Sequence, residues 1–392
     1  MIRLPAFVLI AFLCSTLGTP APRGSEGPSR QSRAPRDGRI LVRNAFGEVT
    51  VSGGAEKIEA TAKTSDGRST TVSIVDDPEQ PGRKRIEPAA QRGSTISINV
   101  KVPHRVELDV ITVNGSITVT DIDGAVSAAT EIGRVNAERI SSLKAVTTSG
   151  SVDARDVREI VAAETRDGNV QIYRAGSARV RTRSGNIVLS SLSGSVSVSS
   201  LSGNIRSTGA KGSLVAKCIS GNMQIENSGG IVDIVGSNGN ITVFRADRDV
   251  RAFSASGDIT VSCVKGRAEL GNASGSITIK SAAGDVDAQT AAGRIDFQGH
   301  IHAGGSYRMK AVSGEVRMAI QPDPPGFTAT LSDYNGEIET AFPLKVESPV
   351  TGAVNRKLIG RYGDGNSRIS LDTFSGAVRI IIDTSGETNE CK

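Results

Sequence analysis

Apolar and polar side chains alternate in short runs along most of this chain, and each run follows a glycine. Counting from that glycine, the second and fourth residues are apolar, whereas the first and third are polar. Ile117 and Val119 follow Gly115 in this way, and Ile241 and Val243 repeat the pattern later. Alternation with a period of two predicts a strand with one buried face, and the glycine with its preceding Ser or Asn predicts a turn.

The motif glycines recur at steps of 17 or 18 residues, and half-step copies divide several of these steps into nine-residue units. A fixed period of this kind is the signature of a solenoid. The sequence therefore predicts an all-β fold, a single-stranded parallel β-solenoid (β-helix or β-roll) of about 18 residues per coil, with right-handed coils as parallel crossovers favour. The motif glycines are Gly115, Gly133, Gly150, Gly168, Gly185, Gly203, Gly221, Gly239, Gly257, Gly275 and Gly293, and the half-step copies are Gly124, Gly194, Gly212, Gly230, Gly266 and Gly284.

Each coil should carry two short strands on opposite sides of a thin core. The residue two before the glycine is often apolar too, as at Leu192, Leu201, Ile219 and Val264, which allows a third buried facet.

Polar residues one coil apart should be neighbours, about 4.8 Å apart across the sheet. On one half-coil they form an asparagine ladder, whose stacked amides can hydrogen-bond along the axis. On the other half-coil they form columns whose charges mostly alternate in sign, as cross-strand pairing favours. The asparagines are Asn169, Asn186, Asn204, Asn222 and Asn240; one charged column is Asp249, Arg267, Asp285 and the other is Asp233, Arg251, Glu269, Asp287. Further along, Arg294 precedes Glu315, and Asp296 precedes Arg317 and Glu339.

The two ends of the repeat are irregular. Residues 39–110 predict a β-rich N-terminal cap, with strands over 40–43, 48–52, 57–63, 70–75 and 95–102 and a charged loop over 76–93. The solenoid is expected over 111–383, with its last coils ending at Gly314 and Gly336, an excursion over 343–368 and a final motif at Gly376. Residues 384–392 are expected to be a flexible tail.

The N-terminus predicts export. Residues 1–18 resemble a signal peptide, because a basic Arg3 precedes a short apolar run and small residues follow it. Residues 19–38 form a linker rich in Pro, Ser and Arg, and residues 19–43 hold six arginines against two carboxylates. Since the whole chain has a net charge of +5, the folded part is nearly neutral. This linker could touch an anionic surface, but solvated spacers of this composition are more common.

Composition limits the chemistry further. Aromatic residues are 3% of the chain and Trp is absent, so a large compact core is not expected. Basic and aromatic residues are not interleaved, which argues against nucleic-acid binding. No apolar run of the mature chain reaches the length of a transmembrane helix.

Three groups of residues are candidate functional sites, but a structural interpretation is simpler for each of them. Glu269 and Asp287 could form the carboxylate pair of a glycosidase or lyase, but they should lie closer than hydrolases require, and the sequence shows no aromatic platform for stacking on sugars. His300 and His302 share one strand face and could bind a metal with Asp296. Calcium-binding rolls need Asp-rich turns, which only the isolated segment 120–124 approaches. We therefore predict no catalytic residues, no cofactor and no metal.

Three cysteines remain after the predicted cleavage. Cys218 and Cys263 should lie 2.5 coils apart on opposite halves, or about 12 Å along the axis, which is too far for a disulfide. Both are expected to be free, and Cys391 lies in the predicted flexible tail.

The ends of the repeat resemble a known family. The segment from Val102 to Val119 resembles the entry to a bacterial family described by the words "putative adhesin", a domain of unknown function, and Ile359 to Gly365 with Ile369 to Val378 is similar to its C-terminal signature. The resemblance covers about residues 40–383. It implies an envelope or surface β-solenoid and supplies no catalytic residues.

The sequence thus favours a non-catalytic secreted or cell-envelope protein, periplasmic or on the cell surface. It would act as an adhesin or scaffold that binds an unidentified protein or glycan through flat polar faces. Two alternatives stay open at this stage: a polysaccharide-active β-helix enzyme, either a lyase or a hydrolase, and an accessory protein of envelope stress.

Overall fold

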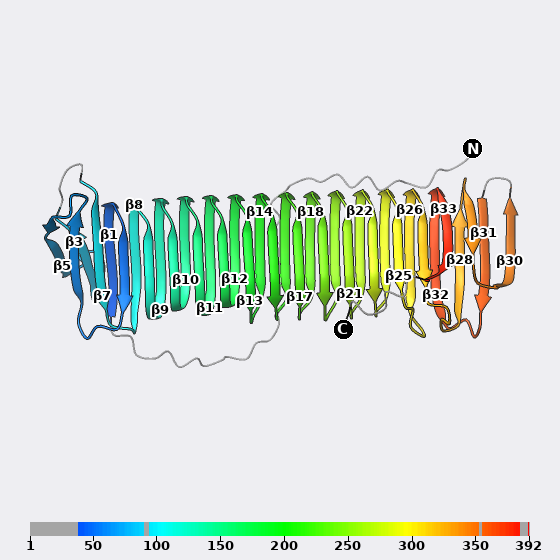
Figure 1. Cartoon of the computed structure of the whole chain (residues 1–392), viewed down its shortest axis with the longest axis horizontal. Coiled ribbons are helices and arrows are strands. Elements are labelled where there is room, and N and C mark those ends of the chain that lie inside the picture. The colour runs from blue at the N-terminus through cyan, green and yellow to red at the C-terminus, as the bar shows by residue number, and fades with distance from the viewer. Residues whose placement is uncertain (1–37, 90–93, 353–354, 385–390, 392) are drawn as a thin grey trace. The chain divides into compact units, whose positions relative to one another are not determined.

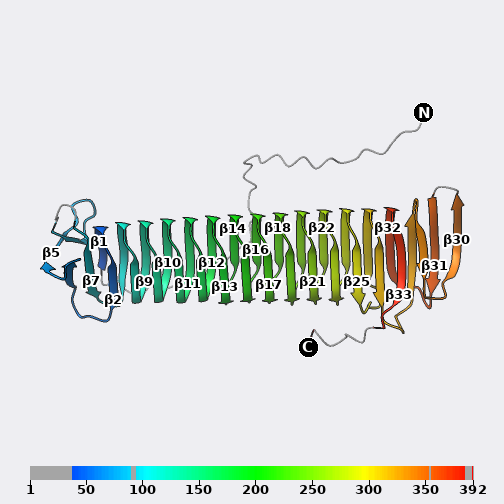
Figure 2. The ribbon, with the colours of Figure 1, turned by 45° about the horizontal axis from the view of Figure 1, so that its top comes forward.

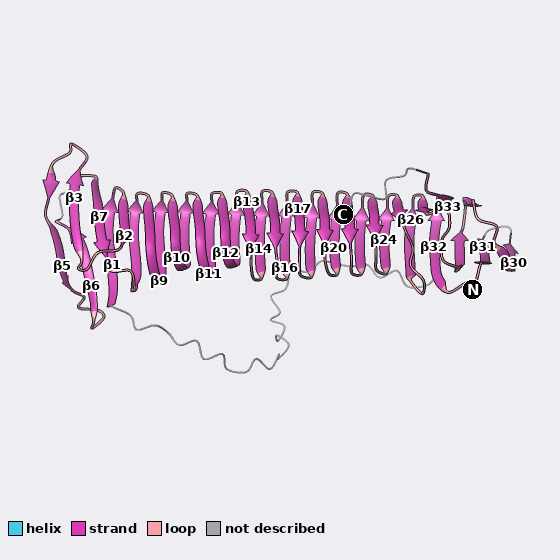
Figure 3. Cartoon of the chain, turned by 60° about the horizontal axis from the view of Figure 1, so that its bottom comes forward, coloured by secondary structure: helices cyan, strands magenta, loops and turns pink. Residues whose placement is uncertain are grey.

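The computed structural model describes residues 38–89, 94–352, 355–384 and 391, and every regular element in them is a strand (Figure 3). The predicted signal peptide and nearly all of the basic linker therefore lie outside the described residues. No helix in the described part of the chain is long and apolar enough to span a membrane.

The strands fall into three groups along the chain. The N-terminal group is β1 (Gly38–Phe46), β2 (Val49–Gly53), β3 (Glu59–Thr64), β4 (Ser69–Thr70), β5 (Val72–Asp76), β6 (Arg83–Pro88) and β7 (Ile96–Val102). The repeat contains β8 (Val106–Asn114), β9 (Ile117–Ile132), β10 (Val135–Ser149), β11 (Val152–Asp167), β12 (Val170–Ser184), β13 (Ile187–Leu192), β14 (Val196–Ser202), β15 (Ile205–Ala210), β16 (Leu214–Ser220), β17 (Met223–Ser228), β18 (Val232–Asn238), β19 (Ile241–Ala246), β20 (Val250–Ser256), β21 (Ile259–Val264), β22 (Ala268–Ser274), β23 (Ile277–Ala282), β24 (Val286–Ala292) and β25 (Ile295–Gly299). The C-terminal group is β26 (Ser306–Ser313), β27 (Val316–Ile320), β28 (Phe327–Asp333), β29 (Glu337–Thr340), β30 (Lys345–Gly352), β31 (Asn355–Tyr362), β32 (Ser367–Ser375) and β33 (Ala377–Ile382).

The repeat folds as the predicted all-β parallel solenoid. Ile187 pairs with Ile205, Ile205 with Met223, and Met223 with Ile241, so that neighbours along the axis are 18 residues apart. Beyond β12, which pairs with both β13 and β14, odd-numbered strands of the repeat pair with odd-numbered strands and even-numbered strands with even-numbered strands. Each coil thus contributes one strand to a first sheet (odd) and one to a second sheet (even), and the coils stack along one axis (Figures 1 and 2).

In the first coils of the repeat, one long strand contributes its N-terminal part to the first sheet and its C-terminal part to the second sheet. The N-terminal part of β12, from Val170 to Ala175, pairs with β13 in the first sheet, and its C-terminal part, from Ala178 to Ser184, pairs with β14 in the second. The bend begins near the end of the N-terminal part, where one residue has positive φ, which is Arg174 in β12 (φ 54°). Positive φ is rare in residues other than glycine, so this corner is a defined feature of each coil.

The alternating apolar residues form the core. Ile117, Val119, Ile241 and Val243 are all fully buried. The possible third facet is only half present, because the apolar residues two before a glycine divide into two kinds. Leu192 and Val264, before half-step glycines, are buried, whereas Leu201 and Ile219, before main glycines, are 44% and 51% exposed.

The motif glycine is required by contact between coils. A Cβ atom on Gly221 would lie 2.3 Å from the carbonyl oxygen of Gly203, one coil back, and a Cβ on Gly239 would lie 2.3 Å from that of Gly221. Both glycines also have positive φ (143° and 124°). Steric exclusion and backbone conformation therefore both favour glycine at this position.

A buried polar column lies three residues before the motif glycine, and the sequence pattern did not reveal it. Thr130 donates its hydroxyl hydrogen to the carbonyl oxygen of Gly115 (3.1 Å), and Thr290 does the same to Gly275 (3.2 Å). These bonds satisfy carbonyl groups at the tight turns. The buried members are Asn44, Thr112, Thr130, Thr147, Thr165, Thr182, Ser200, Cys218, Ser254, Asn272, Thr290, Asp333 and Thr373.

The β-rich N-terminal cap is present, but its coils do not follow chain order. Strand β1 lies between β6 and β8, and β2 lies between β7 and β9. Strands β3 and β5 add antiparallel edges to β7 and β6. The predicted loop over 76–93 is wrong at β6, where Ile86 is fully buried and Arg83 makes a buried ion pair with Asp77.

The C-terminal coils are interleaved in the same way, which corrects the expected order. Strand β32 lies between β26 and β28, and β33 lies between β27 and β29. The last coil of the chain therefore lies between two coils that precede it in sequence. Figures 1 and 2 show β32 and β33 in red before β31 and β30 along the axis. Strands β30 and β31 form an antiparallel hairpin that extends the edge at β28.

The cysteine prediction is partly wrong. Cys218 is free and buried, and it occupies the second sheet while Cys263 lies in the first, so no bond joins them. Cys263, however, is bonded to Cys391, 128 residues away, with 5.3 Å between the Cα atoms. The sequence argument compared only Cys218 with Cys263 and assigned Cys391 to a free tail. The bond fixes Cys391 to the solenoid.

Candidate binding face

The asparagine column makes hydrogen bonds that run from coil to coil. The Oδ1 atom of Asn169 accepts from the backbone N–H of Asn186 (2.8 Å), and the Oδ1 of Asn186 accepts from the N–H of Asn204 (2.9 Å). Asn204 and Asn222 continue the series to Asn222 and Asn240. The series extends beyond the predicted residues, since Asn240 bonds the N–H of Asp258, and Asp258 that of Ser276. Each bond joins an asparagine side chain to the backbone N–H of the next coil, and not one side-chain amide to another.

The charged columns of the second sheet place carboxylates next to arginines. Arg251 lies 3.5 Å from Glu269, and Asp287 lies 3.8 Å from Arg308 and 3.9 Å from Arg267. Glu269 and Asp287, the candidate catalytic pair, are register neighbours, and each faces an arginine.

The other three members of these columns are aspartates, which either accept hydrogen bonds from backbone N–H groups or lie next to an arginine. Asp249 accepts from the N–H of Arg267, and Asp285 accepts from the N–H of Ser306, each at 2.9 Å. Asp233 is paired in register with Arg251.

The first sheet also carries the charged residues predicted near the C-terminal end of the repeat, and one of them has a different neighbour from the one predicted. Arg294 lies 3.3 Å from Glu315, and Asp296 lies 2.9 Å from Arg317. Glu339 contacts Arg379 of the inserted last coil (2.7 Å) and is not the register neighbour of Arg317.

The histidine candidates do not converge with Asp296. The Nδ1 atom of His302 lies 2.8 Å from the hydroxyl of Tyr307, and its Nε2 lies 3.8 Å from Asp285. His300 is exposed, while Ile301 between them points into the core. Within the described residues, no group of three or more His, Cys, Asp or Glu side chains could hold a metal ion. Burial raises the pKa of Tyr307 to about 12, so this phenol stays neutral.

The corner between the two sheets carries a charge ladder that the sequence pattern did not show. Arg139 binds both carboxylate oxygens of Asp121 (2.7 and 3.1 Å), and Arg174 binds both of Asp156 (2.5 and 2.7 Å). The hydrogen bonds from these arginines lower the pKa of both aspartates. The carboxylates of Asp121 and Asp123, in the calcium-like segment, are bonded to Arg139 and Arg158.

A pair of exposed aromatic rings corrects the expectation that no aromatic platform exists. Tyr334 and Phe374 stack with their centroids 4.6 Å apart and their planes at 12°. They meet because the last coil is inserted next to the coil of β28, and their 40-residue separation in sequence hides this. The two rings cover one face of each other, so only their outer faces and edges remain for a ligand.

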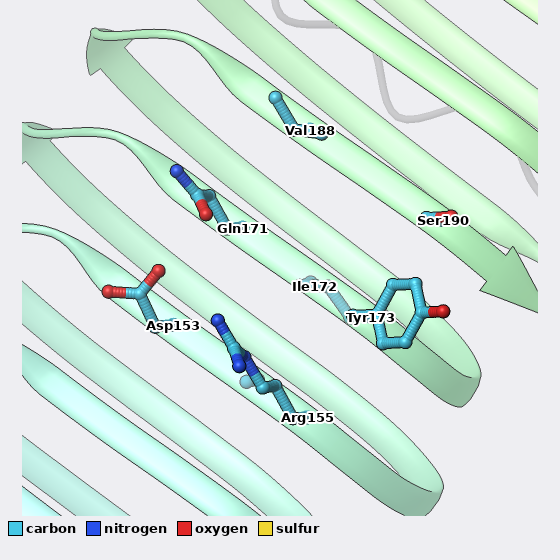
Figure 4. A pocket seen from close by; sticks show the side chains of 8 residues that line it. Asp153, Arg155, Gln171, Ile172, Tyr173, Val188 and Ser190 are labelled. Carbon is cyan, nitrogen blue, oxygen red and sulfur yellow. The ribbon is translucent and has the colours of Figure 1, made fainter.

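The outer face of the first sheet is hollowed over β11, β12 and β13. Asp153, Arg155, Gln171 and Tyr173 point to the same side there (Figure 4), and the hollow measures about 310 Å³. An adjoining hollow of about 540 Å³ shares three of these side chains and extends over β9 and β10, where Asn136 lines it. Both hollows are open to solvent. They form a continuous shallow polar strip, which we call the strip face.

Several groups of the strip face have no partner within the part of the chain that the structure describes. Arg155 has no carboxylate within ion-pair distance, and the side-chain amide of Gln171 makes no hydrogen bond there. Tyr173 is 43% exposed, and the guanidinium of Arg174 lies 4.3 Å from the centre of its ring. Donors, acceptors and an amphipathic ring thus lie together on a flat surface.

The comparisons with known proteins bear on the repeat. Residues 208–381 match the family described as Toastrack DUF4097. This match confirms the predicted resemblance to a β-solenoid family of unknown function. The Toastrack match begins within β15, so the strip face over β9–β13 lies outside the matched residues.

A likeness to one solved structure is much weaker. A chain described as a "putative cell adhesion protein" from Clostridium sporogenes ATCC 15579 is 7% identical, with 88% of this chain and 92% of that chain covered and a TM-score of 0.14. At that TM-score the likeness carries no argument about function. No curated protein matches the chain.

Proposed function

We propose that this chain is a non-catalytic adhesion or scaffold module, which acts outside the cytoplasm and binds a glycan or a protein through the strip face. The observation that carries the proposal is the cluster of uncommitted polar groups around Tyr173. A tyrosine offers both an apolar ring and a polar tip, and rigid aromatic residues surrounded by adaptable hydrogen-bonding groups are typical of binding surfaces.

The shape of the strip face supports a polymer or a macromolecular surface as its ligand. Pockets for small molecules enclose most of the ligand, whereas the hollows here are shallow and continuous over five strands. The carboxylates considered for a catalytic pair, Glu269 and Asp287, lie on the other sheet beside arginines. The strip face therefore fits binding better than it fits turnover.

A glycan and cell-surface binding screen of the full-length chain tests the proposal. Tyr173→Ala combined with Gln171→Ala should weaken the binding about tenfold or more, as loss of a central aromatic contact usually does. Deletion of residues 19–38 should leave the binding at the strip face unchanged.

The chain offers a matched control four coils away. Thr242 and Phe244 of β19 occupy the same two columns as Gln171 and Tyr173, and Arg245 lies 5.0 Å from the ring centre of Phe244 as Arg174 does over Tyr173. Thr242→Ala with Phe244→Ala should keep full binding. Equal losses in both double variants, or no binding by the unaltered chain, would contradict the proposal.

A further inference from the structure

Strand β12 presents three arginines in a row on the outer face of the second sheet. Arg179, Arg181 and Arg183 alternate with Ala178, Val180 and Thr182, which are buried. All three arginine side chains are exposed. Alternate residues of a strand are about 6.6 Å apart, so the three charges span about 13 Å across the sheet.

These three arginines lack the acidic partners that many other arginines of the repeat have. Elsewhere, arginines such as Arg251 and Arg139 lie within 4 Å of a carboxylate. Across the described part of the chain, none of Arg179, Arg181 and Arg183 makes such a pair. Their charge is therefore available to a ligand.

The neighbouring strands add to the positive charge. Arg183 lies beside Arg166 of β11, as the pairing of Thr165 with Thr182 and of Asp167 with Ser184 requires. Lys144 and Lys217 lie in the columns of Arg179 and Arg181, each two coils away. The carboxylates in this area are Glu164, next to Arg181, and Asp167, which lies 3.6 Å from Arg166. Positive charge thus exceeds negative charge on this area, which we call the arginine face.

We propose that the arginine face binds a linear acidic polysaccharide, a sugar polymer that carries sulfate, phosphate or carboxylate groups. Guanidinium groups bind such anions through two parallel hydrogen bonds. On the next strand, Ser197 and Ser199 stand beside Arg179 and Arg181. Their short side chains leave room for sugar rings and their hydroxyls can bond sugar hydroxyls.

Two other polyanions fit the arginine face less well. Single-stranded nucleic acids are held by aromatic side chains that stack on the bases, and the exposed apolar residues here are the aliphatic Val146, Leu201, Val215 and Ile219. An anionic bilayer is a plane, and it would also cover Asp233, three coils along the column of Arg179. A linear polymer can follow β12 and avoid that carboxylate.

This inference goes beyond the proposed function and does not depend on it. The strip face and the arginine face belong to the same coils, because β12 supplies Tyr173 to one sheet and Arg179, Arg181 and Arg183 to the other. One module could therefore hold an acidic polymer on one side and a different partner on the other.

Binding of the full-length chain to immobilised dextran sulfate and alginate tests the inference, with uncharged dextran as the blank. The triple variant R179Q/R181Q/R183Q should bind dextran sulfate about 10- to 100-fold more weakly, since each exposed charge contact contributes about a factor of two to five. The dependence of its binding on salt should also become less steep, because fewer counterions are released.

The matched control is R251Q/R267Q/R308Q, which removes the same charge from the same sheet. Those three arginines already face carboxylates, so this variant should bind within about twofold of the unaltered chain. The basic N-terminal residues are identical in both variants and add the same background. Circular dichroism verifies that each variant is folded.

Several results would overturn the inference. Equal losses in the two triple variants would show that net charge alone attracts the polymer. Failure of the unaltered chain to bind either polysaccharide would exclude the ligand class. A loss of binding to oligothymidylate or to phosphatidylglycerol vesicles, with polysaccharide binding unchanged, would assign the arginine face to another polyanion. Tyr173→Ala with Gln171→Ala should leave dextran sulfate binding intact, so the two proposals can fail separately.

Discussion

Single residues at the tight turn decide how closely the coils can stack. The motif glycine admits the carbonyl oxygen of the coil before it, and the buried polar residue three positions earlier bonds such a carbonyl. In one coil this residue is Cys218, whose sulfur lies 3.4 Å from the carbonyl oxygen of Gly203. Cys218 therefore takes the place of a threonine or serine, and burial raises the pKa of its thiol.

Thr290 tests the contribution of this column. Thr290→Val keeps the volume but removes the hydrogen bond to Gly275, so we expect it to lower the free energy of unfolding by about 1–2 kcal/mol. Thr290→Ser retains the hydroxyl and should cost less than about 1 kcal/mol. Urea unfolding followed by circular dichroism gives both values. Equal costs for Val and Ser would mean that packing, not the hydrogen bond, stabilises the turn.

Tyr307 predicts a loss of stability in alkaline solution. Its pKa is raised by burial from 10.0 to about 12, so the fold favours the neutral phenol. The stabilisation from this group is present below pH 10 and is lost as the pH rises towards 12. Thermal unfolding midpoints should fall over that interval, and less steeply in Tyr307→Phe. An absorbance titration should show one late tyrosine ionisation that the variant lacks.

At the scale of elements, the two ends differ from the middle because their coils are interleaved. A solenoid end exposes unpaired strand edges, which proteins usually cover. Here the last coil, β32 and β33, is enclosed between two coils that precede it in the chain. The Cys263–Cys391 bond then connects the chain end to a coil of the repeat.

Two truncations separate the contributions of the enclosed coil and the disulfide. A chain that ends at Asn366 loses β32 and β33, so β28 and β29 lose their parallel partners. Hydrogen exchange should then become fast over residues 327–340 while β13–β21 stay protected. A chain that ends at Asp383 loses the disulfide but keeps β32 and β33, which should stay protected. Protection of residues 327–340 in the shorter chain would show that the enclosed coil is not needed there.

The sequence predicts the regular coils well and the irregular parts poorly, for a physical reason. Ile241 and its column neighbours obey a local rule, because each coil repeats the environment of the one before. Interleaving, the contact of Tyr334 with Phe374 and the Cys263–Cys391 bond depend on where distant segments meet, which no local pattern encodes. The strip face is intermediate in this respect. The period predicts the columns of outer residues to which Gln171 and Tyr173 belong, but only the structure shows the hollow that distinguishes these two residues from other outer residues.

At the scale of the molecule, the solenoid is close to one-dimensional, because each coil contacts mainly its two neighbours. Stability in such proteins is approximately a sum of coil and interface contributions. The strip face and the arginine face occupy a few coils near the N-terminal side of the repeat, whereas the disulfide and the enclosed coil lie on the C-terminal side. Changes at one end should therefore have little effect on binding at the other.

This one-dimensional order predicts that whole coils, but not half-coils, can be removed. Deletion of residues 222–239 removes 18 residues and brings Asn240 next to Asn204, so the asparagine column, the motif glycines and the two sheets stay in register. Deletion of residues 222–230 removes nine and moves every later strand to the opposite sheet, where the positive-φ corner and the glycine turn no longer stack on their equivalents.

We expect the first variant to keep its circular dichroism spectrum and its binding through Tyr173, and the second to unfold at a clearly lower urea concentration. Similar stability of the two variants would mean that the nine-residue unit, and not the 18-residue coil, is the structural repeat.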